Sequence, residues 1–86
     1  MSRNIEITEM SEIELLNIFA SNLKYMMEYT EINQRELAIR SGISEPTISR
    51  YLNASTKPSI TAIVNFCYAL NCDIYDLVPT ACVVIE

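Results

Sequence analysis

The stretch that decides the fold is QRELAIRSGISEPTISRYLN, residues 34–53. It contains two short helical patterns, residues 34–41 and 45–52, separated by Gly42, which is the only glycine in the chain. The chain must turn sharply between the patterns, and such a turn after a helix usually needs a residue with positive φ. Glycine adopts that conformation without steric cost. The stretch therefore predicts two helices joined by a tight turn, which is a helix-turn-helix motif.

The residues at the helix starts agree with this prediction. Asn33 precedes the first pattern as an N-cap, and Glu36 three residues later is placed to complete a capping box. Ser44 precedes the second pattern as its N-cap. Pro46 falls in the first turn of that helix, where a missing N–H costs little.

The second pattern has two chemically different faces. At about 100° per residue, Ile48, Tyr51 and Leu52 share one side. In a helix-turn-helix protein, the outer face and N-terminal end of the second helix meet base edges in the major groove. The outer side here carries Pro46, Ser49, Arg50 and Asn53.

Several linked motifs carry a family resemblance. They are Asn33-Gln34-x-Glu36-Leu37-Ala38, Ser41-Gly42-Ile43-Ser44, Thr47-Ile48-Ser49-Arg50, Lys57-Pro58-Ser59 and Ala69-Leu70-Asn71. With them, residues 23–79 resemble the lambda-repressor-like (Cro-type) helix-turn-helix family. The resemblance implies a five-helix, all-α domain that binds operator DNA as a homodimer. The family often has a glycine after the second helix. Asn53-Ala54 stands there in this chain, and we expect Asn53 to take the left-handed conformation.

The composition fits one small all-α domain. The chain has 86 residues, half of them apolar, with only one glycine and three prolines. We expect an N-terminal arm at 1–10, a compact five-helix domain at 11–79 and a short apolar tail at 80–86. The first helix begins after a capping box at Ser11 and runs to about Tyr29, which makes it longer than the family requires. Its apolar residues at helical spacing begin at Ile13.

The later helices are predicted from the same signals. Ser59 caps a fourth helix, and Asp73 caps a short fifth helix that extends to Val78. Phe66 lies on one flank of the fourth helix, where it could serve a dimer contact. The expected buried stripe of the fourth helix is Ile60, Ile63, Val64, Cys67 and Leu70.

Other functional classes find little support. The chain has no histidine, and its three cysteines have no metal-ligand spacing, so we expect no metal, no cofactor and no enzymatic activity. No small-molecule ligand is evident. No apolar run approaches the ~18 residues of a membrane span, and no signal-peptide pattern is present. We expect a cytoplasmic protein with reduced thiols.

The net charge of −5 is unusual for a DNA-binding protein. However, five of the six basic residues fall within residues 24–58, so an acidic body carries a basic face. Such a face can bind DNA with weaker non-specific affinity. The acidic balance also supports the alternative of a protein-interaction module on the same fold, such as an anti-repressor or a complex subunit.

The candidate base contacts lie at the start and on the outer face of the second motif helix. Arg50 can bind guanine O6 and N7 in a bidentate way. Glu45 can accept from cytosine N4, or it can simply stabilise the helix N-terminus. The full predicted set of base contacts is Ser44, Glu45, Pro46, Ser49 and Arg50.

The candidate phosphate contacts surround that helix. The resemblance implies that Gln34 holds a phosphate, and helix N-termini do bind anions. Arg35 and Arg40 either contact phosphate or pair with nearby glutamates. Ile39 either packs against the first helix or touches sugar or a thymine methyl. The predicted phosphate contacts are Lys24, Gln34, Arg35, Arg40, Thr47, Asn53, Ser55, Thr56 and Lys57.

The function that these residues predict is sequence-specific binding of double-stranded DNA by a homodimer on a palindromic operator. The outcome would be transcriptional regulation, as a repressor, in a bacterium, phage or mobile element. The tail at 80–86 is uncharged until Glu86, so we expect it to be buried. It either folds back along the first helix or, as we favour, joins the fourth and fifth helices in the dimer contact.

Overall fold

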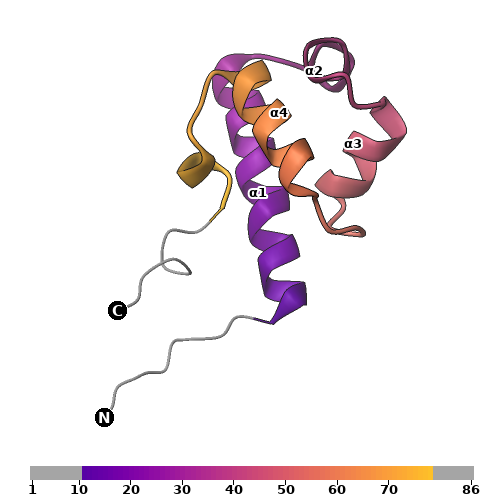
Figure 1. The fold of residues 1–86 in the computed structure, drawn as a ribbon, viewed down its shortest axis with the longest axis vertical. Coiled ribbons are helices and arrows are strands. Elements are labelled where there is room, and N and C mark those ends of the chain that lie inside the picture. Colours follow the sequence, from indigo (N-terminus) through magenta and orange to yellow (C-terminus); the bar gives the residue numbers. More distant parts are fainter. Residues whose placement is uncertain (1–10, 79–86) are drawn as a thin grey trace.

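The computed structural model describes residues 11–78, which form four α-helices and one short 3₁₀ helix with no strand among them (Figure 1). The predicted all-α class is confirmed for this part of the chain. Five α-helices are not confirmed, because four are α-helical and the fifth segment forms only a 3₁₀ turn. The predicted arm at 1–10 and tail at 80–86 lie outside the described residues. The elements are α1 (Glu12–Thr30), α2 (Gln34–Ser41), α3 (Glu45–Leu52), α4 (Ile60–Leu70) and the 3₁₀ helix η1 (Ile74–Asp76).

The segment predicted as a fifth helix forms only the single turn of η1. The Asp76 carboxylate accepts a hydrogen bond from the backbone N–H of Asp73 at 2.9 Å, which closes the turn. Leu77 is then completely buried, and its carbonyl accepts from Asn22 Nδ2 at 3.1 Å. Val78 precedes a proline, which disfavours the α conformation. The helical turn therefore ends at Asp76, and the next residue, Leu77, is anchored on α1.

Helix α1 begins as predicted and is longer than the body packed against it. The hydroxyl of Ser11 accepts from Glu14 N at 3.1 Å, and the Glu14 carboxylate accepts from Ser11 N at 3.0 Å, so the capping box is confirmed. The helix ends at Thr30 and is followed by Glu31, which is left-handed with φ 60°. Ile13, the first residue of the predicted apolar pattern, is 71% exposed on a turn that projects beyond the core (Figure 1).

The α2–α3 turn forms as the sequence predicts. Gly42 has φ +75°, and Ser44 caps α3 by accepting from Thr47 N at 3.3 Å. Asn33 likewise caps α2, since its side chain accepts from Glu36 N at 2.8 Å. The reciprocal half of that capping box is a wrong prediction. The Glu36 carboxylate instead accepts from Arg40 Nε at 2.8 Å, because the charged partner one turn later binds it more strongly.

The turn after α3 differs from the prediction by one residue. Asn53 has φ −90°, and Ala54 is the left-handed residue with φ +58°. The hydrogen bonds explain this. Ser55 N donates to Arg50 O at 2.9 Å and Ala54 N to Tyr51 O at 3.1 Å, which is the Schellman pattern with Ala54 at its left-handed position. An alanine therefore carries the strain that a glycine would avoid.

The core is built around three aromatic rings from three helices. Phe19 of α1 lies 6.0 Å from Tyr51 of α3, and Tyr51 lies 5.7 Å from Phe66 of α4, both edge-to-face. Phe66 is completely buried, so its predicted role on an exposed dimer flank is wrong. Leu23, Leu37 and several other apolar residues complete this core around the rings.

Helix α4 buries a different face from the one predicted. Its buried residues are Ala62, Phe66, Ala69 and Leu70. Of the predicted stripe, Leu70 is buried and Ile63 and Cys67 are half-buried, but Ile60 is 79% exposed and Val64 41% exposed. The helix is apolar on both sides, so periodicity could not choose between them. The small Ala62 and Ala69 belong to the core cluster, and Phe66 is completely buried within it.

Candidate nucleic-acid interface

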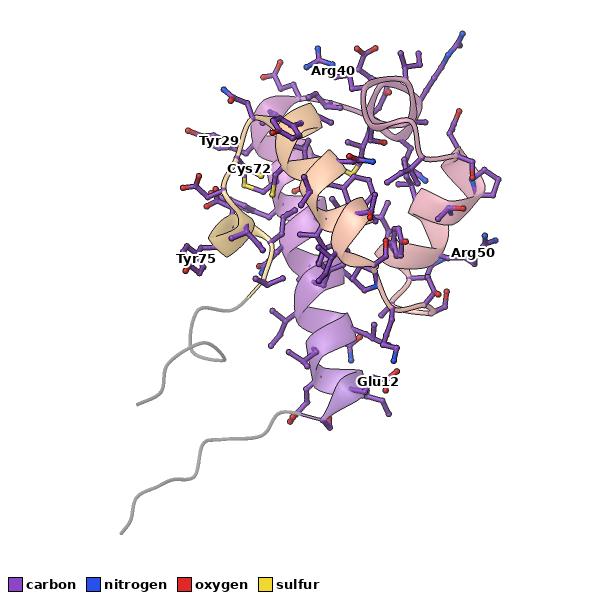
Figure 2. All side chains as sticks on the ribbon, in the orientation of Figure 1. Glu12, Tyr29, Arg40, Arg50, Cys72 and Tyr75 are labelled. Carbon is purple, nitrogen blue, oxygen red and sulfur yellow. The ribbon has the colours of Figure 1, made fainter. Side chains whose placement is uncertain are left out.

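The outer face of α3 is not covered by any other part of residues 11–78. Ser44, Glu45, Pro46 and Arg50 are exposed, and Ser49 is half-buried. The opposite face is fixed, because Ile48 and Tyr51 are buried in the core. Figure 2 shows Arg50 pointing away from the body of the protein. All five predicted base contacts therefore lie at the start or on the outer side of one anchored helix.

Hydrogen bonds organise this outer face. The Ser44 hydroxyl donates to Thr47 Oγ1 at 2.9 Å, and Arg50 Nη2 donates to the same oxygen at 3.2 Å. Thr47 is half-buried, whereas Arg50 is exposed. The Arg50 guanidinium is thus held over the turn that precedes it, without a carboxylate partner among residues 11–78.

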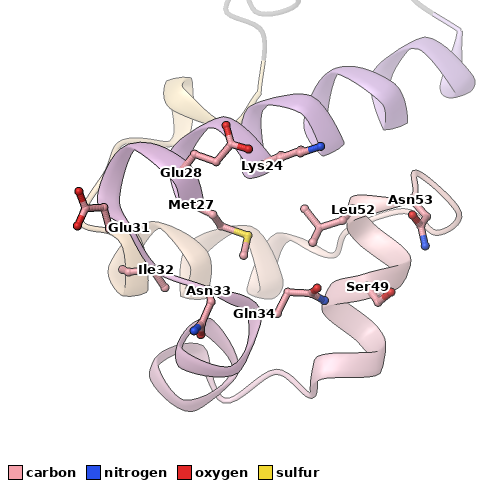
Figure 3. Close-up of a pocket in the computed structure, with 10 residues that line it drawn as sticks. All are labelled: Lys24, Met27, Glu28, Glu31, Ile32, Asn33, Gln34, Ser49, Leu52 and Asn53. Atoms are coloured by element: carbon pink, nitrogen blue, oxygen red, sulfur yellow. The ribbon is translucent and has the colours of Figure 1, made fainter.

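A groove beside α3 brings together predicted contacts from three helices (Figure 3). Lys24 comes from α1, Gln34 from the first turn of α2, and Ser49 from α3, with Asn53 at the end of α3. The N-terminal N–H groups of α2 lie beside this groove and can bind an anion. The groove thus offers a cation, amides and a hydroxyl, which are the groups that hold a phosphate oxygen.

Sequence reasoning missed two acidic residues of the same groove. Glu28 and Glu31 line it with Lys24 (Figure 3). Their i+4 and i+7 spacing from Lys24 is the signal that could have found them. Two carboxylates reduce the positive potential at this end of the face, which is consistent with the acidic composition of the chain.

The remaining phosphate candidates divide into free and paired residues. Arg35 is exposed, and within residues 11–78 it has no ion pair. Arg40 forms the predicted alternative, a pair with Glu36 at 2.8 Å, and lines a different depression beside Tyr29 and Asn71. The structure therefore does not bring Arg40 to the groove of Gln34.

The loop after α3 has a structural role that the sequence did not reveal. The Ser55 hydroxyl donates to Arg50 O at 3.0 Å, so this side chain helps to close α3. Lys57 lies 3.9 Å from the Glu12 carboxylate, a long contact between exposed groups, and Thr56 is half-buried.

Ile39 of α2 is 68% exposed, which excludes the alternative that it packs against α1.

The described cysteines are outside this face. Cys67 and Cys72 are half-buried free thiols at the end of α4. Burial, and next the neighbouring Cys67, raise the pKa of Cys72 to about 12. Within residues 11–78 no group of His, Cys, Asp or Glu is arranged to hold a metal ion. The same residues include no helix long and apolar enough to cross a membrane.

Residues 22–80 match the model of the Cro/C1-type HTH DNA-binding domain, which covers more than half of the chain. The chain belongs to this family. The matched range includes α1 from Asn22 onward, α2, α3, α4, η1 and the groove residues. The resemblance that the sequence motifs predicted is confirmed, and the α2–α3 unit is the helix-turn-helix of a DNA-binding domain.

Solved structures share the fold at low sequence identity. The restriction-modification controller protein C.AhdI from Aeromonas hydrophila has a TM-score of 0.69 at 21% identity, covering 72% of this chain and 94% of that one. The hypothetical transcription factor NHTF from Neisseria gives 0.72 at 20%, covering 87% and 86%. An HTH_3 family transcriptional regulator from Vibrio cholerae gives 0.75 at 13%, covering 78% of this chain but 38% of that one. The comparison with curated proteins found no match.

Proposed function

We propose that this Cro/C1-type protein is a homodimeric transcriptional regulator that binds a palindromic operator and represses transcription, in a bacterium, phage or mobile element. The observation that carries the proposal is the continuity of the outer face of α3 with the groove of Figure 3. The first presents side chains suited to base edges, and the second presents groups suited to a phosphate. Together they would recognise the base sequence and fix the position of the protein along the DNA.

Each copy would insert α3 into the major groove, with Arg50 and its neighbours facing base edges. Lys24, Gln34 and Arg35 would contact the flanking backbone. About 4–6 phosphate contacts per bound dimer would give a slope of log Kd against log salt concentration near 4–5. Repression follows when such a complex occupies DNA that the transcription machinery needs.

The dimer contact is best placed on the side of the protein away from Arg50. Ile60, Val64 and Tyr68 form an exposed stripe along α4 at i, i+4 and i+8, and η1 adds Ile74 and Tyr75. Arg50 and Tyr75 lie on opposite sides of the body in Figure 2. An apolar stripe of this size on a small domain favours a protein contact. A second copy is the partner that two half-sites, one helical turn apart, would require.

Light scattering and DNA titration test this dimer. Tyr68→Glu should produce monomers and weaken operator binding at least ten-fold. Ile39→Glu places the same charge on another exposed apolar residue and should leave the protein dimeric. A Tyr68→Glu protein that remains dimeric would refute the choice of face. A wild-type protein that selects no DNA sequence would refute the regulator and favour the protein-interaction alternative.

A further inference from the structure

Three polar side chains form a ridge along the outer face of α3. Ser44, Thr47 and Arg50 are spaced at i, i+3 and i+6, and hydrogen bonds join them in order. Ser44 is fixed twice, since it donates to Thr47 Oγ1 at 2.9 Å and accepts from Thr47 N at 3.3 Å. The threonine hydroxyl that receives Arg50 Nη2 is therefore itself held in place.

The ridge determines where the guanidinium lies. Helical side chains lean toward the N-terminus of their helix, so a bond from Arg50 to Thr47 draws the cation over the first half of α3. That half is the part which helix-turn-helix proteins present to base edges. An arginine already confined to one region loses less conformational entropy on binding than a free one.

A hydroxyl is suited to this task because it orients the cation without neutralising it. The contrast lies on the neighbouring helix, where Arg40 is held by a carboxylate at 2.8 Å. A carboxylate at position 47 would cancel the charge of Arg50 and repel phosphates. Thr47 leaves the charge intact, and the other N–H groups of the guanidinium remain able to donate to an acceptor pair.

We infer that Thr47 is a positioning residue for base readout, which holds Arg50 for bidentate donation to guanine O6 and N7. The sequence alone had assigned Thr47 to a phosphate. This inference rests on the proposed function, because it requires a preferred operator that contains the guanine. It adds a specific coupling: the contribution of Thr47 to DNA affinity passes through Arg50.

A double-mutant cycle measures that coupling. Affinities of the full chain, Thr47→Val, Thr47→Ser, Arg50→Ala and the Thr47→Val/Arg50→Ala double variant would be determined by fluorescence anisotropy. The probes are the selected operator and the same operator with 7-deazaguanine at the contacted position. Thr47→Val keeps the shape of the side chain and removes the hydroxyl, whereas Thr47→Ser retains it. Circular dichroism melting confirms that each variant is folded.

Thr47→Val should weaken operator binding about three- to ten-fold, as expected for one lost hydrogen bond, and Thr47→Ser should stay within two-fold. In the Arg50→Ala background, Thr47→Val should cost nothing more. Both substitutions should have a smaller effect on the 7-deazaguanine probe. Equal losses with and without Arg50 would overturn the positioning role and restore the phosphate assignment. If the wild type prefers no sequence, the proposed function fails and the inference fails with it.

Discussion

Ala54 offers a direct test of how the end of α3 is formed. It is a non-glycine residue at φ +58°, in the position that closes the Schellman turn. The left-handed conformation costs an L-residue about 1–2 kcal/mol, and glycine avoids that cost. Part of the gain is lost because glycine gives the unfolded chain about 0.4–1 kcal/mol more conformational entropy. Ala54→Gly should therefore raise the free energy of unfolding by about 0.5–1 kcal/mol.

The assay is reversible unfolding followed by circular dichroism. For a domain of this size, the change corresponds to a rise in Tm of about 2–8 °C. Gly42→Ala is the mirror-image control, because Gly42 has φ +75° and an added Cβ would meet no atom within 4 Å. Its cost is confined to the backbone, so it should lower stability by a similar amount. If Ala54→Gly fails to stabilise while Gly42→Ala destabilises, the left-handed assignment of Ala54 is refuted.

Three further predictions concern the core, the thiols and the DNA face. Phe66→Ala should lower the free energy of unfolding by about 3–5 kcal/mol, measured by denaturant titration, because it empties the centre of the aromatic cluster. The pKa of the Cys72 thiol is raised to about 12 in the folded state, above the value of about 8.5 in the unfolded chain. The free energy of unfolding therefore keeps the full contribution of this thiol below about pH 8.5 and loses it as pH rises toward about 12. Alkylation mapped by mass spectrometry should be slower at Cys72 in native than in denatured protein at pH 8.5, and equal rates would contradict the shift. Arg35→Ala should weaken binding to all DNA sequences similarly and reduce the slope of log Kd against log salt concentration. Arg40→Ala should have a smaller effect on both, because Arg40 is paired with Glu36.

The features that the sequence predicted well are the local ones. The N-caps Ser11, Asn33 and Ser44 and the positive φ of Gly42 depend on bonds within a few residues, so the spacing of residue types is enough to find them. The helix-turn-helix and the outer face of α3 follow from these signals. The position of Ala54 was missed because the turn hydrogen bonds, and not the tolerance of Asn53 for the left-handed region, decide which residue takes it.

The features that the sequence missed depend on tertiary packing. Helix α4 is apolar on both sides, and its small residues Ala62 and Ala69 are buried in the core cluster with Phe66. A hydropathy pattern favours the larger Ile60 and Val64, which are exposed. The groove beside α3 joins residues as far apart as Lys24 and Asn53, so Glu28 and Glu31 could be assigned to it only after the helices were placed.

Selection of binding sites from random double-stranded DNA by the purified full chain is the most direct test of sequence-specific binding. We expect one dominant palindrome whose half-sites are separated by about 10 base pairs. Each half-site should contain a guanine that the wild-type protein selects and the Arg50→Ala variant does not. Enrichment of no sequence at low salt by wild-type protein of native helicity would contradict DNA readout by α3.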